Sequence, residues 1–469
     1  MNADGFLIYD QPSSQTTSFK VGNAVVPAPA YIPEIKSVED LIALLNFSSV
    51  IPKGNPIMVP AYRWSNIISD PRVRQRSILH GTDLIARFLA EHPIYFYDPP
   101  EFYKYSLGSE LVRYALKGEG ISTFEKRLKE GKTEAALDPI PEFFKPFIQR
   151  QMDGIRHKLE IENGCSERSR PHVERAWLDT EIDEAYVPYI YRVVAEALKM
   201  PSAVLIPPVP PLSPSSEDSY ISRVVSSNRA ASIACADLSK KSKSGFGNQG
   251  HVIYPYFHLY LDWSIAEHRS RGINAERIGD LLEEELDSGS FAGVAVTIIG
   301  YENAAKNRKF QKVDDLMTDI VNICSQCYLP VILPRSEWFG LALTDIQIQG
   351  FGSLLNGKIR YMPRGGGGRN PDDPYGKTPL IEGCYELKRS EVIEYINENG
   401  ELPFVQGLPR KPSSEDLENP DLYRKRFSKP MRLIHIEEAR RVRNDKLKGN
   451  IEPAKLYFSR SEHNYLKGY

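Results

Sequence analysis

Four aspartates each follow directly on a short apolar run, an arrangement that could supply carboxylates for acid–base or nucleophilic chemistry. Asp98 follows PIYFY, Asp237 follows ASIACA, Asp262 follows YFHLYL and Asp345 follows GLALT. When carboxyl groups share a site, burial can keep one protonated while another stays ionised, which suits cleavage of a bond to a sugar carbon. We therefore take Asp98, Asp262 and Asp345 as candidate catalytic residues and Asp237 as a candidate substrate-binding residue.

Six other side chains are candidates for substrate binding, because they lie within or just after apolar runs or beside a glycine-rich loop. They are Arg63, Trp64, His258, Arg335, Glu337 and Arg364. His258 precedes Asp262 by four residues, so in a strand both point to the same side and could share a pocket or a metal. No third ligand occurs at a fixed spacing, so we predict no metal site. The alternative is that each acid caps a helix or closes a turn, and that His258 is a core histidine bonded to a neighbour.

The elements that would position these residues are short apolar runs alternating with segments of helical periodicity. The predicted strands are Pro56–Tyr62, Pro93–Tyr97, Ala203–Pro207, Ser232–Ala236, Val252–Asp262, Phe291–Ile299, Pro330–Pro334 and Leu341–Ile346. Alternation of this kind is typical of parallel βα units, and eight strands predict an α/β fold, a closed (β/α)8 TIM-like barrel. Catalytic groups of such barrels lie at the C-terminal ends of the strands, so the four aspartates should converge on one rim. The segment Asp237–Gly250 has no helical pattern and Arg335–Gly340 is short, which leaves a seven- or nine-stranded open sheet as the alternative.

The chain divides into five regions by pattern. Residues 1–98 carry an N-terminal hairpin and the first barrel strands, and residues 99–200 have helical periodicity and read as a helical insertion. Residues 201–360 carry the remainder of the barrel. Residues 361–421 are Gly/Pro-rich loops with a short helix, and residues 422–469 form a basic C-terminal arm.

Three short motifs invite a chemical interpretation. Gly245–Gly250 matches G-x-G-x-x-G but precedes a predicted strand, whereas a dinucleotide site needs the motif to open a helix. Cys324 and Cys327 form a lone C-x-x-C at the end of a predicted helix, where buried structural thiols are the better interpretation. The tetraglycine segment Gly365–Gly368 is flanked by arginines and could cradle a phosphate, cover the barrel mouth or be a plain loop. No cofactor is predicted.

The C-terminal arm differs in charge from the rest of the chain. Residues 422–469 hold thirteen Lys/Arg and five Asp/Glu, which is a net charge of +8. The whole chain has a net charge of −2, so the remaining residues have a net charge of about −10. Interleaved aromatic and basic side chains favour nucleic acid, either tRNA or DNA. The candidate nucleic-acid-binding residues are Arg424, Lys425, Arg426, Lys429, Arg440, Arg441 and Arg443. The alternative is an arm that docks on the acidic body or forms a homodimer contact.

Composition limits the class of protein. The chain has 469 residues, of which 41% are hydrophobic and 26% charged, typical of a folded protein with a sizeable core. No apolar run is long enough to span a membrane, and no signal segment follows the start, so we expect no membrane partner. Five cysteines are too few for a disulfide framework and favour a reducing, cytoplasmic location.

Two N-terminal segments carry a family resemblance. Phe19–Pro33 reads FKVGNAVVPAPAYIP, and Pro93–Ser106 reads PIYFYDPPEFYKYS. The first resembles the opening hairpin of the tRNA-guanine transglycosylases, which runs into a TP-x-x-x-P segment, and the second resembles their strand ending in an aspartate. Those enzymes are (β/α)8 barrels that exchange a nucleobase through aspartate chemistry. The resemblance covers the first hundred residues or so and implies a general-base role for Asp98, although Pro99 and Pro100 follow it instead of small residues, and the family's cysteine-rich zinc motif is absent.

Together these patterns predict a barrel enzyme acting on a nucleobase–sugar or sugar linkage, with a nucleic acid as a candidate substrate. In that reading Asp98 is the acid or base, Asp262 or Asp345 is the nucleophile or electrostatic stabiliser, and Arg335 holds an anion. The alternative is that the protein is a non-catalytic nucleic-acid-binding or scaffold protein that binds its partner through the basic arm.

Overall fold

The computed structural model describes the barrel and most of its surrounding helices. The described residues are 7–9, 16–22, 24–46, 51–61, 64–79, 84–98, 121–138, 182–244, 251–269, 272–300, 309–336, 340, 343–354, 378–380, 385–387 and 398. The basic arm 422–469, the Gly245–Gly250 motif and the tetraglycine segment lie outside them.

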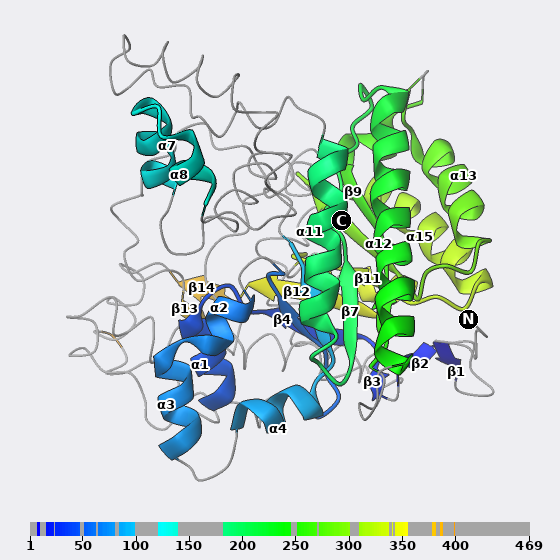
Figure 1. The fold of residues 1–469 in the computed structure, drawn as a ribbon. Helices are drawn as coiled ribbons and strands as arrows, with labels where there is room; N and C mark the ends of the chain where they lie inside the picture. The colour runs from blue at the N-terminus through cyan, green and yellow to red at the C-terminus, as the bar shows by residue number, and fades with distance from the viewer. Residues whose placement is uncertain are drawn as a thin grey trace.

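A parallel sheet forms the centre of the molecule (Figure 1). Its strands are β4 (Ala30–Glu34), β5 (Ile57–Val59), β6 (Ile94–Tyr97), β7 (Ala203–Ile206), β8 (Ile253–Pro255), β9 (Phe257–Asp262), β10 (Val294–Ile299), β11 (Val331–Leu333) and β12 (Gly350–Leu354). The pairing order is β8-β7-β6-β5-β4-β12-β11-β10-β9. The first and last strands of the barrel, β4 and β12, are therefore neighbours.

The sheet closes through one bent segment. β8 pairs with β7 and β9 pairs with β10, and the two strands are consecutive in the chain, with only Tyr256 between them. The Tyr256 amide donates to the Leu205 carbonyl at 2.9 Å, and the next amide, of Phe257, donates to the Gly293 carbonyl at 2.9 Å. Because β8 and β9 together form one bent strand, the nine labelled strands correspond to the eight strands of a barrel. The predicted (β/α)8 TIM-like barrel is confirmed.

Six of the predicted strands are present, and two predictions were wrong. Ser232–Ala236 lies inside the helix α12 (Asp218–Ser244), and Leu341–Ile346 contains the 3-10 helix η3 (Leu343–Ile346). The strands that replace them in the barrel are β4 and β12. In α12 the small residues Ala231, Ala234 and Cys235 are buried at helical spacing while Ile233 is 58% exposed, so the run faces the core as a helix does.

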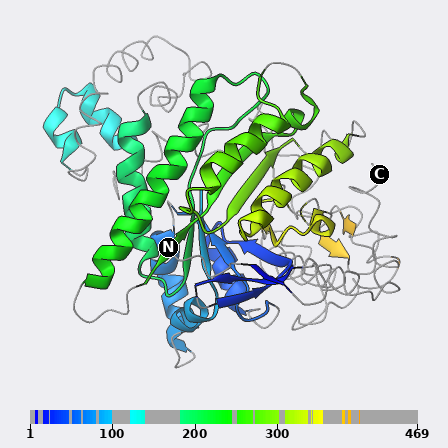
Figure 2. The same ribbon diagram turned by 90° about the vertical axis from the view of Figure 1, so that its right-hand side faces the viewer.

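A small antiparallel sheet covers one end of the barrel. Its strands are β1 (Leu7–Tyr9), β2 (Thr16–Val21) and β3 (Ala24–Pro27), and β3 leads within three residues into β4 (Figure 2). Phe19, Val21 and Val26 are buried against residues of the barrel interior such as Ile32. The hydroxyl of Ser202, which immediately precedes β7, donates to the Val21 carbonyl at 3.0 Å. The small sheet therefore closes the N-terminal end of the barrel.

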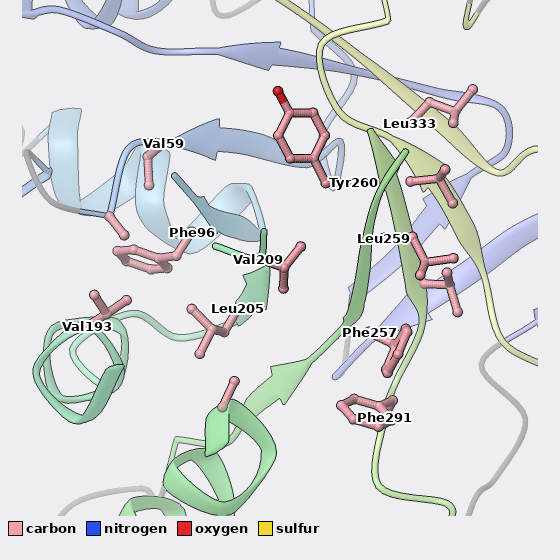
Figure 3. Packing of buried hydrophobic residues seen from close by; sticks show 14 of the residues in the cluster. Val59, Phe96, Val193, Leu205, Val209, Phe257, Leu259, Tyr260, Phe291 and Leu333 are labelled. Atoms are coloured by element: carbon pink, nitrogen blue, oxygen red, sulfur yellow. The ribbon is translucent and has the colours of Figure 1, made fainter. Parts of the chain in front are cut away.

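Helices surround the barrel (Figures 1 and 2). They are α1 (Val38–Asn46), α2 (Trp64–Ser69), α3 (Pro71–Leu79), α4 (Leu84–Glu91), α11 (Ile182–Ala197), α12, α13 (Ala275–Leu286) and α15 (Phe310–Gln326), with the 3-10 helices η2 (Trp263–Glu267) and η3. The Ser37 hydroxyl caps α1 by accepting the Asp40 amide at 3.3 Å. Outward-facing strand residues pack on these helices, and Figure 3 shows Val193 of α11 facing Phe96 and Leu205.

The region predicted as a helical insertion contributes to the barrel itself. Its described elements are α7 (Ile121–Lys129), α8 (Thr133–Leu137) and α11. In Figure 1, α7 and α8 stand apart from the ring of helices, whereas α11 lies beside α12 and leads into β7. Beyond the barrel, β13 (Thr378–Leu380) and β14 (Tyr385–Leu387) form an antiparallel pair. In the part of the chain that the structure describes, no helix has the length and apolar character needed to cross a membrane.

Candidate functional site

The interior of the barrel changes from apolar to polar along its axis. Near the N-terminal end it holds residues such as Ile32, Val204 and Ala295. Toward the C-terminal ends of the strands five polar or charged side chains, which we call the inner polar layer, are each at most 2% exposed. They are Glu34, Tyr97, His258, Thr297 and Arg335. Catalytic groups of such barrels lie at the C-terminal ends of the strands, and polar groups are buried there in this protein although their burial is costly unless they are paired. We therefore take the C-terminal mouth as the candidate site.

A buried ion pair spans the first and seventh strands of the barrel. Arg335, two residues after β11, donates from Nε to one Glu34 oxygen at 2.7 Å and from Nη2 to the other at 2.6 Å. The two side chains are 2% and 1% exposed. The guanidinium carbon also lies 5.7 Å from the ring centroid of Tyr97, within cation–π range. The predicted strand-end cation is therefore at the barrel mouth, where Glu34 neutralises its charge.

A glycine on the intervening strand lies close to the backbone of Arg335. β12 lies between β11 and β4, and its residues at the levels of Ala30 and Ile32 are Gly350 and Gly352. A Cβ atom at Gly352 would lie 3.1 Å from the Arg335 amide nitrogen. Arg335 itself has φ of 53°, a left-handed conformation that costs a non-glycine residue about 1–3 kcal/mol. Local backbone preference is thus overridden to bring Arg335 onto Glu34.

A directional hydrogen-bond chain forms the rest of the inner polar layer. The His258 Nδ1 atom lies 2.7 Å from the Pro207 carbonyl and therefore donates to it. His258 Nε2 must then accept, and the Thr297 hydroxyl donates to it at 3.0 Å. The Tyr97 hydroxyl lies 3.3 Å from Thr297 Oγ1 and donates in turn. Burial lowers the pKa of His258 to about 4, so the ring is neutral near pH 7 and does not act as a base there.

Asp98 lies at the rim, one residue beyond β6. Strand alternation turns Tyr97 into the barrel and Asp98 toward α11, where the Tyr189 hydroxyl donates to Asp98 Oδ2. Asp98 is 2% exposed and Tyr189 is 1% exposed. A buried carboxylate at the C-terminal end of a barrel strand is where the sequence predicted one.

The other predicted acids occupy different environments. Asp262 ends β9 and caps η2, because its Oδ1 accepts the Ser264 amide at 2.9 Å and the Ser264 hydroxyl at 2.5 Å. Asp237 lies on α12, not after a strand, and accepts the Tyr191 hydroxyl at 2.8 Å. Asp345 lies in η3, which packs against α15, and its side chain is outside the described residues. The expected convergence of all four acids on one rim is therefore wrong for Asp237, and capping explains the position of Asp262.

The remaining predicted residues divide into two groups. Trp64 is buried among the helices outside the barrel, and its Nε1 has no acceptor among the residues that the structure describes. The others lie outside the described residues: Arg63, Glu337, Arg364, Arg424, Lys425, Arg426, Lys429, Arg440, Arg441 and Arg443.

Metal and thiol chemistry find little support in the described part of the chain. No group of three His, Cys, Asp or Glu side chains there is arranged to hold a metal ion. Cys324 and Cys327 are free thiols at the C-terminal end of α15, and burial raises the pKa of both. A raised pKa disfavours the reactive thiolate, which agrees with the structural interpretation of this motif.

Sequence reasoning missed Glu34, Tyr97, Thr297 and Tyr189. Glu34 ends the run AYIP as the other candidate acids end theirs, but Pro33 within this run and Pro29 just before it obscured the strand. No local pattern could identify Tyr189, because only the packing of α11 on β6 brings it to Asp98. In comparisons with known proteins, neither a family model nor a curated protein matches this chain.

Proposed function

We propose that this protein is a barrel enzyme that uses carboxylates at its C-terminal mouth on a nucleobase–sugar or sugar linkage, with a nucleic acid as the favoured substrate. The observation that carries the proposal is the environment of Asp98. Its position also agrees with the resemblance to tRNA-guanine transglycosylases, in which the aspartate after this strand takes part in base exchange.

Asp98 differs from the other buried acids of the described residues, which are Glu34, Asp40 and Glu285. Glu34 pairs with Arg335, and Glu285 pairs with Arg229 at 2.6 Å. Asp40 accepts the Ser37 hydroxyl and the Lys36 amide at the start of α1. Each of these three has a plain structural role. Asp98 instead lies at the C-terminal end of a barrel strand, where the catalytic groups of such barrels lie, and it accepts the Tyr189 hydroxyl from α11.

The proposed chemistry uses two carboxyl groups. One carboxylate forms a bond to the sugar carbon as the bond to the base breaks, and the departing base takes a proton from the acid. An incoming base then returns a proton to that group as its nitrogen attacks the sugar carbon and releases the carboxylate. We assign the proton transfers to Asp98, and the nucleophilic role to Asp262 or Asp345.

Base exchange is the direct test. The full-length protein would be incubated with radiolabelled guanine and either bulk tRNA or duplex DNA, and label retained in the nucleic acid would be counted. We expect Asp98→Asn to reduce incorporation by about 100- to 10,000-fold, the usual contribution of an acid–base group. Asp237→Asn is the matched control, because that acid also accepts a tyrosine hydroxyl but lies on α12. The proposal fails if the wild-type protein neither incorporates nor releases a base, or if both variants lose activity equally.

A further inference from the structure

The last helix of the region between β6 and β7 is fastened to the barrel rim by tyrosines. The Tyr186 hydroxyl donates to the carbonyl of Pro208, which follows β7, at 2.9 Å. One turn later the Tyr189 hydroxyl donates to Asp98, which follows β6. α11 thus contacts the C-terminal ends of two adjacent strands through residues spaced three apart on one helix face.

The contact between Tyr189 and Asp98 is suited to orienting a carboxylate. Both side chains are almost completely buried, at 1% and 2% exposure, so water does not compete effectively for the bond. A phenol hydroxyl also supplies a directed hydrogen bond without a positive charge. It can therefore restrict the rotamer of the carboxylate that accepts it.

A second tyrosine–aspartate bond on the same helix provides a comparison. Tyr191 donates to Asp237 of α12 at 2.8 Å, and both side chains are only partly buried. This hydrogen bond raises the pKa of Tyr191. It joins two outer helices and touches no strand end, so its role is to hold α11 on α12.

We propose that Tyr189 is a positioning residue that fixes the Asp98 carboxylate at the barrel mouth, so that α11 completes the active site. This inference rests on the proposed function of Asp98. It gives α11 a direct role in the chemistry, because this helix supplies the group that orients the acid–base residue. Misplacing a catalytic group by about 1 Å can cost on the order of 100-fold in rate.

The test compares Tyr189→Phe with Tyr191→Phe, since each variant removes one hydroxyl that donates to an aspartate from the same helix. We expect Tyr189→Phe to lower kcat for base exchange by about 10- to 100-fold with KM little changed. Tyr191→Phe should keep kcat within about twofold, because loss of a bond away from the rim removes no transition-state interaction. In an Asp98→Asn background, Tyr189→Phe should cause no further loss.

Crystal structures of the two variants separate this inference from the proposed function. In Tyr189→Phe the Asp98 carboxylate should leave its wild-type rotamer, and in Tyr191→Phe it should stay. An unchanged Asp98 in Tyr189→Phe, or equal losses of kcat in both variants, would overturn the positioning role even if base exchange is confirmed. If the wild-type protein shows no base exchange, the proposed function fails, while the rotamer comparison still decides whether Tyr189 orients Asp98.

Discussion

The buried ion pair between Glu34 and Arg335 allows a quantitative prediction about the stability of the barrel mouth. Replacing Glu34 with Ala removes two charge-assisted hydrogen bonds, of 2.6 and 2.7 Å, and leaves a guanidinium that is 2% exposed without this counter-ion. Breaking a buried pair by removing one partner typically costs about 3–5 kcal/mol, because the remaining charge is poorly solvated. We expect the free energy of unfolding to fall by about that amount.

An exposed pair provides the matched control. Glu39 accepts Arg72 Nη1 at the same distance of 2.6 Å, but the side chains are 31% and 57% exposed. Because water screens this pair, Glu39→Ala should cost about 1 kcal/mol or less. The contrast between the two variants isolates burial from hydrogen-bond length.

Guanidinium chloride unfolding followed by circular dichroism would measure the free energy of unfolding of both variants. An unchanged slope of this free energy against denaturant concentration would show that the same amount of surface is exposed on unfolding. The double variant Glu34→Leu with Arg335→Met should recover most of the stability, since apolar residues of similar size often replace a buried pair without loss. Burial does not strengthen the Glu34–Arg335 pair if Glu34→Ala lowers the free energy of unfolding no more than Glu39→Ala does. The reasoning is equally refuted if Glu34→Leu with Arg335→Met is less stable than Glu34→Ala.

Two further predictions concern His258 and the basic arm. Burial holds the pKa of His258 at about 4 against an ordinary 6.5, so below pH 6.5 the unfolded chain binds a proton that the folded protein excludes. The free energy of unfolding should therefore fall as the pH drops from about 6.5 to 4, and His258 should contribute up to about 3 kcal/mol of this fall. When unfolding is measured across this pH range, the His258→Gln variant should not show the contribution of His258. Deleting residues 422–469, whose net charge is +8, should weaken binding to tRNA or DNA and flatten its salt dependence in a filter-binding titration. Unchanged affinity for both nucleic acids would exclude the arm as the binding element.

The sequence was sufficient to predict the barrel, because hydrophobic periodicity reports which residues are buried and in what order the elements occur. It failed where local patterns are ambiguous. ASIACA is apolar enough for a strand, yet its alanines and cysteine bury one face of α12 while Ile233 points outward. β4 and β12 were missed because β4 contains Pro33 and β12 contains Gly350 and Gly352, and both residue types weaken the local signal for a strand.

The candidate site was only partly predictable, because its contacts depend on closure of the barrel. Glu34 and Arg335 are separated by 301 positions and meet across β12. Tyr189 and Asp98 are separated by 91 positions and meet only because α11 packs behind β6. Periodicity can place each residue at the end of its own strand or on its own helix. It contains no information on which side chain of another element will face it, since that is set by strand order, tilt and register.

The pairing within the inner polar layer limits which groups can exchange protons at the mouth. His258 is held neutral with both ring nitrogens bonded, and Glu34 is held by Arg335 in a pair with no net charge. Protonating His258 would break the buried hydrogen bond that it accepts from Thr297, which is costly where water is excluded. In the proposed function, proton transfer is therefore assigned to the rim above this layer. Of the described buried acids, Asp98 is the one that lies just beyond the end of β6 at this rim, and we accordingly expect the proposed activity to depend on the orientation of Asp98.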